Sequence, residues 1–320
     1  MRTSVLLLAT VAVAVPATAR AAEPKLTVPK AKLEASLKCT EGIDDATRTP
    51  LMIVTGTGAS GDEAYAIGKP AIDDYGAPAC WVNFPNHTTA DIQVSVQYLV
   101  YGLRTMYARA GRKLVVFGIS QGALLPRIAL TYWPSLRGMV DDVIAAAGTQ
   151  HGTTVFREDR CGTKGTRCVP AVFQQTVGSN LLRALNRKGR DETPGPTSWT
   201  TVRSSTDETV QPQTGAHPTS ALQGATNVLI QDVCPGRETS HIGTALDSVT
   251  FALIIDAAEH AGPAKVDRLP ADVCDHPYAK GFDEQQTAAV LDASGALTSS
   301  RADSEPKVAR EPRVRAWFKR

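Results

Sequence analysis

The chain has 320 residues, of which 42% are hydrophobic and 21% are charged. This is an ordinary globular composition, and the length is enough for one large α/β domain or two small ones. Because the formal net charge is only +2, the overall charge gives no indication of a nucleic-acid partner.

The first 21 residues have the pattern of a secretory signal peptide. Met1 and Arg2 supply a positive start, residues 5–15 are apolar, and residues 19–21 form a cleavage site rich in small residues. The apolar run is too short to span a bilayer, which argues against a retained membrane anchor. No later segment resembles a transmembrane helix, so we expect a soluble protein that is secreted to the extracellular space.

The rest of the chain alternates between expected strands and helices. Short apolar, β-branched runs predict buried strands, and apolar residues at helical spacing predict helices that bury one face. Because helices of ten or more residues separate the strands, we expect an α/β fold with a mainly parallel central sheet flanked by helices. Strands are expected over residues 51–54, 79–82, 113–117, 140–147, 200–204 and 227–230, and helices over residues 91–110, 123–133, 243–260 and 284–297.

Two regions depart from this alternation. Residues 149–196 contain glycines, charges and two close cysteines, with a helix expected over residues 173–187, and this is the natural place for a small cap or lid. Residues 299–320 are charged, and we expect a disordered tail there. The sequence thus predicts one catalytic domain over residues 22–298, which includes the cap, followed by the tail.

The most informative motif is Gly118-Ile119-Ser120-Gln121-Gly122, which lies between an expected strand and an expected helix. A serine on so sharp a turn cannot bury its hydroxyl, and the glycines allow neighbouring backbone to approach closely. The turn would therefore hold the serine Oγ above the sheet edge, where a histidine can reach it. This is the nucleophile elbow of an α/β-hydrolase, so the motif predicts that Ser120 is a catalytic nucleophile.

Acyl transfer by a serine needs a histidine base and a carboxylate that orients it, and in this fold they follow in the order serine, acid, histidine. Asp207 is the best candidate acid because it lies just past an expected strand, and the adjacent Glu208 is the alternative. His241 is the best candidate base, since it lies between an expected strand and an expected helix. The remaining histidines precede the acid, follow it too closely, end an apolar helix or lie in a polar region: His87, His151, His217, His260 and His276.

The transition state also needs hydrogen-bond donors for the developing oxyanion. The backbone amide of Gln121 is one expected donor, because it directly follows the nucleophile. A second donor is expected from the glycine-rich loop 55–58, which follows an early strand. This loop has no Lys-Ser/Thr pair after its glycines and no G-x-G-x-x-G pattern, so it does not indicate a nucleotide site, and we expect no cofactor.

The chain contains six cysteines, an even number that favours disulfides in an exported protein. Six cysteines allow fifteen pairings, so their number does not fix the connectivity. No pair has C-x-x-C spacing and no histidine pair is suitably placed, so we expect no metal site. Exported thiols tend to oxidise, which argues against a cysteine nucleophile.

At these residues the chain resembles the family of Candida antarctica lipase B. The resemblance implies an α/β-hydrolase fold and a catalytic triad of Ser120, Asp207 and His241. The matching blocks are residues 54–58, 80–82, 120–122, 131–135, 173–178, 206–213, 233–234 and 240–243, and together they spread over most of the mature chain.

The same resemblance implies the rest of the site and part of the disulfide pattern. The amide of Gln121 would be joined in the oxyanion hole by the amide and hydroxyl of Thr57. The implied disulfides are Cys39–Cys80 and Cys234–Cys274.

The chain also differs from the family pattern. Gly118 and Ile119 stand where the family has threonine and tryptophan, and that tryptophan helps shape the pocket on the alcohol side. Residues 157–169 look like an inserted or rebuilt lid loop, in which Cys161 and Cys168 are close enough to pair locally. The third disulfide of the family, near its C-terminus, has no counterpart here.

These features predict a secreted carboxylic-ester hydrolase, of lipase or esterase type, that acts on triacylglycerol-like esters. The expected partner is an ester or lipid substrate, with a lipid–water interface in the case of a lipase, and no stable protein partner is implied. Two alternatives stay open. One is an acyltransferase or polyester-degrading esterase with little activity on triglycerides, and the other is a catalytically inactive hydrolase fold that serves as a binding protein.

Overall fold

The computed structural model describes residues 22–158, 161 and 166–319. The expected signal peptide, residues 1–21, lies outside this range. None of the helices in the described part of the chain combines the length and the apolar composition that crossing a membrane requires.

A seven-stranded sheet forms the centre of the described structure, with strand order β1-β3-β2-β4-β5-β6-β7. Neighbouring strands pair in parallel, except that β1 pairs antiparallel with β3 at one edge. The predicted α/β fold with a mainly parallel central sheet is therefore confirmed. The strands are β1 (Leu37–Cys39), β2 (Leu51–Val54), β3 (Ala79–Val82), β4 (Leu114–Ile119), β5 (Val140–Ala146), β6 (Ser198–Arg203) and β7 (Thr226–Leu229).

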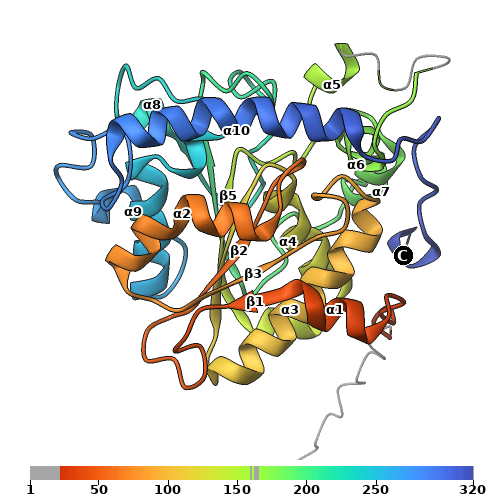
Figure 1. Ribbon diagram of the computed structural model, residues 1–320, viewed down its shortest axis with the longest axis horizontal. Helices are drawn as coiled ribbons and strands as arrows, with labels where there is room; N and C mark the ends of the chain where they lie inside the picture. Colours follow the sequence, from red (N-terminus) through yellow and green to blue (C-terminus); the bar gives the residue numbers. More distant parts are fainter. Residues whose placement is uncertain (1–21, 159–160, 162–165, 320) are drawn as a thin grey trace, which may run out of the picture.

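Helices cover both faces of this sheet (Figure 1). Helices α3 and α4 contribute to the apolar core on one face, and α2 and α9 contribute to a second core on the other. Helix α10 runs across the end of the molecule at the top of the view (Figure 1). The helices are α1 (Lys30–Ser36), α2 (Gly61–Tyr75), α3 (Ile92–Ala110), α4 (Gln121–Tyr132), α5 (Val155–Glu158), α6 (Pro170–Gln175), α7 (Asn180–Leu185), α8 (Ile230–Val233), α9 (Ser248–Glu259) and α10 (Glu284–Ser304).

Alternation along β2 explains why the two cores are separate. Met52 and Val54 belong to the core under α3 and α4, whereas Leu51 and Ile53 belong to the core under α2 and α9. Successive side chains of a strand point to opposite faces, so a strand that is apolar throughout buries both. All four residues are buried, as expected for a strand inside a parallel sheet.

Strand β1 and the short helices α1, α5 and α8 were not expected, and two longer helical segments also differ from the prediction. No element was expected over α2, because its Gly68 and Pro70 weaken a helical pattern, although Ser60 and Glu63 form a capping box at its start. The single helix expected over residues 173–187 is wrong. The chain forms α6 and α7 there, and Gly178, with φ of 77°, makes the turn between them.

The prediction of a disordered tail over residues 299–320 is also wrong for its described part. Helix α10 continues through the expected domain boundary at residue 298 as far as Ser304. Farther on, Val308 exchanges two backbone hydrogen bonds with Cys168. The side chain of Phe318 is fully buried and packs on Tyr132, with ring centroids 4.6 Å apart. The many charged residues of this segment suggest disorder, whereas the buried ring of Phe318 fixes the segment to the core.

We expect Phe318→Ala to lower the free energy of unfolding by about 3–5 kcal/mol, because it removes a buried aromatic ring. Chemical denaturation measures this loss. Lys319→Ala, a change at the exposed neighbour, is the matched control and should leave stability within about 0.5 kcal/mol. Equal stability of both variants would mean that the tail is not anchored.

The sheet also buries one carboxyl group that the fold does not pair. Asp142 in β5 is 1% exposed, and neither of its side-chain oxygens has a hydrogen-bond partner. Burial, together with the nearby charges of Asp141 and Asp256, raises the pKa of Asp142 to about 7. Since the charged form is disfavoured in the folded state, this group costs stability as pH rises from about 4 to about 7, and the cost is fully present above that range.

Asp142→Asn should therefore raise the melting temperature more at pH 8 than at pH 5, because asparagine cannot ionise. Thermal unfolding of both proteins at several pH values measures the difference. A difference that stays constant between pH 5 and pH 8 would contradict the role assigned to the Asp142 charge.

Candidate active site

Ser120 lies on the sharp turn between β4 and α4. Its backbone has φ of 58° and ψ of −122°, a left-handed conformation that few non-glycine residues adopt. A Cβ atom on Gly118 would clash with the backbone of Gly122, and one on Gly122 would clash with the carbonyl oxygen of Val54. The two glycines therefore let α4 approach the sheet closely, and this approach requires the turn at Ser120.

Asp207 follows β6 and is almost completely buried, with 1% of its surface exposed. Its Oδ1 accepts hydrogen bonds from the amides of Thr209 and Val210, both at 2.8 Å. Its Oδ2 accepts from Nδ1 of His241 at 2.9 Å and from Nε2 of Gln213 at 3.2 Å. Burial acts to raise the pKa of Asp207, but the His241 charge and these hydrogen bonds outweigh it and lower the pKa.

The Asp207 carboxylate fixes the proton arrangement of His241. An ionised carboxylate can only accept, so Nδ1 of His241 carries the proton of the shared hydrogen bond and Nε2 is left as the basic nitrogen. The backbone amide of His241 donates to Oε2 of Glu208 at 2.9 Å. The two carboxylates considered from the sequence thus contact different parts of His241. Asp207 contacts the imidazole ring, and Glu208 accepts a hydrogen bond from the backbone amide.

A second set of contacts ties the histidine loop to the acid loop. The carbonyl oxygen of Thr239 accepts from the hydroxyls of Ser204 and Thr206 at 3.0 and 2.9 Å. The amide of Thr239 donates back to the hydroxyl of Thr206 at 3.1 Å. These bonds join the segments that carry Asp207 and His241, so the two side chains do not depend on a single contact for their alignment.

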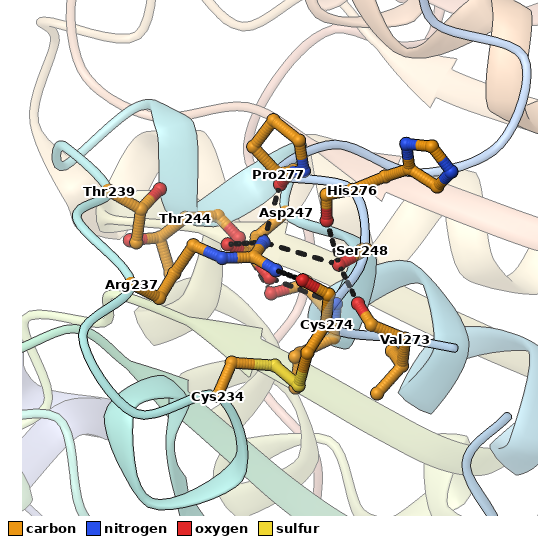
Figure 2. A network of polar contacts seen from close by, with 12 residues as sticks. Cys234, Arg237, Thr239, Thr244, Asp247, Ser248, Val273, Cys274, His276 and Pro277 are labelled. Carbon is orange, nitrogen blue, oxygen red and sulfur yellow. Dashed lines mark hydrogen bonds and ion pairs between the residues drawn. A yellow bond between two sulfur atoms is a disulfide. The ribbon is translucent and has the colours of Figure 1, made fainter. Parts of the chain in front are cut away.

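Arg237 anchors the same loop from its other side (Figure 2). Its guanidinium donates to the carbonyl oxygens of Pro277 and Cys274 at 3.0 and 2.9 Å, and to Oδ2 of Asp247 at 3.3 Å. Cys274 also forms a disulfide with Cys234, three residues before Arg237. The loop that leads to His241 is therefore held at the same place by a covalent link and by a cation whose side chain is only 9% exposed.

The oxyanion region combines Thr57, Gln121 and Gln175. Gln121 begins α4, and the first amides of a helix have no acceptor within it, so the Gln121 amide is available to a ligand. The hydroxyl of Thr57 donates to Oε1 of Gln121 at 2.7 Å, and Nε2 of Gln175 donates to both side chains at 2.8 and 3.1 Å. In this unliganded arrangement the Thr57 hydroxyl is directed at Gln121.

Helix α10 is fastened to the loop that carries Thr57. Arg301 forms a two-pronged ion pair with Glu63, with both N–O distances 2.5 Å, and its hydrogen bonds lower the pKa of Glu63 to about 2. The same guanidinium donates to the carbonyl oxygen of Gly58 at 3.4 Å. A Cβ atom on Gly58 would meet the backbone of Thr298, so the loop and the helix are in close contact.

A cavity of about 460 Å³ opens at Ser120. Ser120, Thr57, His241 and Glu208 all line it, so the structure gathers these expected site residues around one space. Among the described residues, no hydrogen bond joins the Ser120 hydroxyl to His241. Such contacts are often loose in unliganded enzymes and tighten when substrate binds.

The other histidines lie elsewhere. His217 is exposed, and His260 contacts the carboxylate of Asp256 at 3.1 Å. Each of the rest has an ion-pair partner of its own: His87 with Glu305, His151 with Glu192 and His276 with Glu284. In the part of the chain that the structure describes, no group of three or more histidine, cysteine or acidic side chains could hold a metal ion.

The cysteines form three disulfides in the structure: Cys39–Cys80, Cys161–Cys168 and Cys234–Cys274. The first joins the antiparallel edge pair β1 and β3. The second closes a short loop next to α6, within the region expected to form the cap. These are the pairs expected from the resemblance and from the local spacing.

Comparisons with known proteins agree with this fold. No protein-family model matches the chain. The chain is 33% identical over 238 residues to lipase B of Pseudozyma antarctica, and the match covers 72% of this chain and 68% of that protein. The chain belongs to the lipase B family. This membership makes it a carboxylic-ester hydrolase.

Solved structures extend the likeness. The crystal structure of Aspergillus fumigatus lipase B superposes with a TM-score of 0.80 at 25% identity, covering 93% of this chain and 74% of that one. A Bacillus licheniformis lipase in its propeptide form has a TM-score of 0.53 at 17% identity, covering 72% of this chain and 55% of that one, and it shares the fold. The resemblance to the lipase B family drawn from sequence blocks is thus confirmed.

Sequence reasoning did not identify several residues that shape the site. Gln175 and Gln213 lie inside the blocks that match the lipase B family, and their position in those blocks was the available signal. Arg237 and Arg301 lie in no such block, and most of their partners are far away along the chain, such as Cys274, 37 residues from Arg237, and Glu63, 238 residues from Arg301. A single sequence contains no signal for such distant pairs.

Proposed function

We propose that the chain hydrolyses carboxylic esters through a triad of Ser120, His241 and Asp207. One observation carries the proposal: the strained Ser120 lines the same apolar cavity as His241, and the Nδ1 of His241 is bonded to the buried Asp207. A buried carboxylate bonded to Nδ1 leaves Nε2 as a base directed away from the acid, which is the requirement for activating a serine hydroxyl.

The reaction would proceed in two displacements. The Oγ of Ser120 attacks the ester carbonyl while Nε2 of His241 takes its proton, and the resulting oxyanion is stabilised by the amides of Gln121 and Thr57. His241 then gives the proton to the departing alcohol, and the acyl group stays on Ser120. Water, deprotonated by the same histidine, attacks the acyl-enzyme and releases the acid. Asp207 stabilises the imidazolium in both halves.

The hydroxyl of Thr57 would join the oxyanion hole by changing its acceptor. It donates to Gln121 in the unliganded protein, and Nε2 of Gln121 has no partner. An oxyanion is a stronger acceptor than an amide oxygen, so rotation of the hydroxyl toward it is favourable once charge develops. Gln175 continues to donate to the Thr57 oxygen in either arrangement.

The residues that line the cavity support an apolar ester as the substrate. Most of the wall is formed by aliphatic and aromatic side chains, so a lipid-like acyl group fits it. On α10, which lines the cavity, Val290 and Leu297 are 40% and 45% exposed and could contact a lipid–water interface.

The three disulfides favour an oxidising compartment and hence secretion. The mechanism needs no cofactor.

Ser120→Ala should reduce hydrolysis of p-nitrophenyl butyrate by ~10³-fold or more, because it removes the nucleophile. It should also abolish covalent labelling by a fluorophosphonate probe, which reacts with activated serines. Ser205→Ala, a change at an exposed serine near the acid loop, is the matched control. Retention of labelling and activity in Ser120→Ala would overturn the proposed nucleophile, and lack of labelling in the unmodified protein would indicate an inactive hydrolase fold.

Asp207→Asn and Glu208→Gln separate the two candidate acids. We expect Asp207→Asn to lower kcat by ~10³–10⁴-fold, because an amide no longer holds the imidazole in the required tautomer. Glu208→Gln should lose less than ~10-fold, since its amide oxygen can still accept from the His241 main chain. The kcat values on a soluble ester decide the matter, and the reverse order of losses would assign the acid to Glu208.

A further inference from the structure

The turn formed by residues 86–88 has a left-handed backbone at three successive positions. Asn86, His87 and Thr88 have φ of 55°, 47° and 64°. Only glycine adopts this region freely, and the conformation is especially rare for a β-branched residue such as Thr88. Single residues visit it in turns, but a run of three side-chain-bearing residues adds an unfavourable cost at each position. Such strain persists only where surrounding contacts hold it, so the contacts of this turn indicate its role.

The turn forms two hydrogen bonds with residues 55–59, the loop that carries Thr57. The carbonyl oxygen of His87 accepts from the amide of Gly58 at 2.8 Å, and the hydroxyl of Thr88 donates to the carbonyl oxygen of Ala59 at 2.7 Å. The direction of both groups follows from the backbone dihedrals of the turn. Because Gly58 and Ala59 directly follow Thr57, these bonds fix the main chain of the loop beside it.

The turn is itself held in place by several contacts. The amide and the hydroxyl of the fully buried Thr89 both donate to the carbonyl oxygen of Asn86, at 3.0 and 2.7 Å. The carbonyl oxygen of Thr89 accepts from the amide of Ala171 in α6 at 3.1 Å. On the other side, Nδ1 of His87 contacts Oε1 of Glu305 at 2.6 Å. The strained turn is therefore fixed to two neighbouring segments and offers the loop a rigid support.

A support of the main chain matches what the two donors of Thr57 have to do. In the proposed reaction the hydroxyl of Thr57 changes its acceptor from Gln121 to the oxyanion, whereas the amide of Thr57 stays where it is. Bonds to the backbone of the next two residues hold the amide and leave the side chain able to rotate. Glycines at positions 56 and 58 give the loop little rigidity of its own, so the support has to come from outside.

We propose that the left-handed turn preorganises the oxyanion hole, and that Thr88 is a positioning residue for the amide of Thr57. The inference rests on the proposed function, in which this amide stabilises the oxyanion. Such donors lower the barrier only if they are already in place when the charge develops. Thr88 is completely buried, and it is not among the described residues that line the cavity, so it acts through the loop and not on the substrate.

Thr88→Val tests this role, because it keeps the shape of the side chain and removes the hydroxyl. On p-nitrophenyl butyrate, kcat should fall by at least ~10-fold while KM changes by less than ~2-fold, since the oxyanion exists only in the transition state. The affinity for a boronic acid, which forms a tetrahedral adduct with the nucleophile, should fall by a similar factor. Thr88→Ser retains the hydroxyl and should keep kcat within ~3-fold of the unmodified protein.

Thr197→Val is the matched control for lost stability. Thr197 is also buried, and its hydroxyl donates to the carbonyl oxygen of Val140 at 3.0 Å, at the end of the sheet opposite to Ser120. Thermal unfolding should show a similar destabilisation in both valine variants, but only Thr88→Val should lose kcat. Thr88→Gly gives a test that does not depend on the folding of Thr88→Val. Glycine adopts φ of 64° without strain, so this variant should fold and lose kcat to a similar extent.

Three outcomes would overturn the proposal. The first is a folded Thr88→Val or Thr88→Gly variant with unchanged kcat and boronic-acid affinity. The second is an equal loss of kcat in Thr197→Val, which would reduce the effect to general stability. The third is an equal loss in Thr88→Ser, which would assign the effect to the methyl group. Failure of the proposed function gives a different result, because Ser120→Ala would then retain hydrolysis of the same ester.

Discussion

The contact between α4 and the sheet at two glycines is the constraint on which the site depends. Because neither Gly118 nor Gly122 has a side chain, the helix lies against β2 and β4, and the chain must turn through a left-handed residue between strand and helix. That residue is Ser120. The unfavourable backbone conformation is maintained by the burial of the strand before it and of the helix after it. The amide of Gln121 becomes available for the same reason, since it is the first amide of the helix.

The position of Asp207 depends on a different interaction. Its buried carboxylate is held by hydrogen bonds and not by close packing of the backbone. All the hydrogen bonds of the Asp207 carboxylate come from donors that are fixed by neighbouring turns or by His241 itself. An ion buried this deeply is tolerated only when it is fully paired, so the loop geometry and the charge depend on each other. Arg237 and the Cys234–Cys274 disulfide then fix the loop that brings His241 to this carboxylate.

Strands β2 to β7 and the candidate residues of the triad could be predicted because their signals are local, whereas β1 lies in a mixed, polar region where no strand was expected. A buried strand such as β2 is apolar throughout, and Ser120 stands between two glycines at a strand end. The tail could not be predicted, because its order depends on Phe318 packing against Tyr132, 186 residues earlier in the chain. The same holds for Arg301 and Glu63. Helix α2 was missed for a local reason, since Gly68 and Pro70 contradict the pattern that its packing against the sheet enforces.

Gly68, one of the two residues that weaken the helical pattern of α2, also leaves space beside the sheet within the cavity. A glycine in a helix interior costs about 1 kcal/mol relative to alanine, and a larger apolar side chain at position 68 would fill the space beside Ile72. Glycine at position 68 therefore lowers the stability of the fold in two ways, through its poor helix propensity and through the missing buried contacts. A gap that lowers stability on two counts, and that is continuous with Ser120, is accounted for if a ligand occupies it. On this argument the apolar layer under α2 serves the ester-binding site as well as the core.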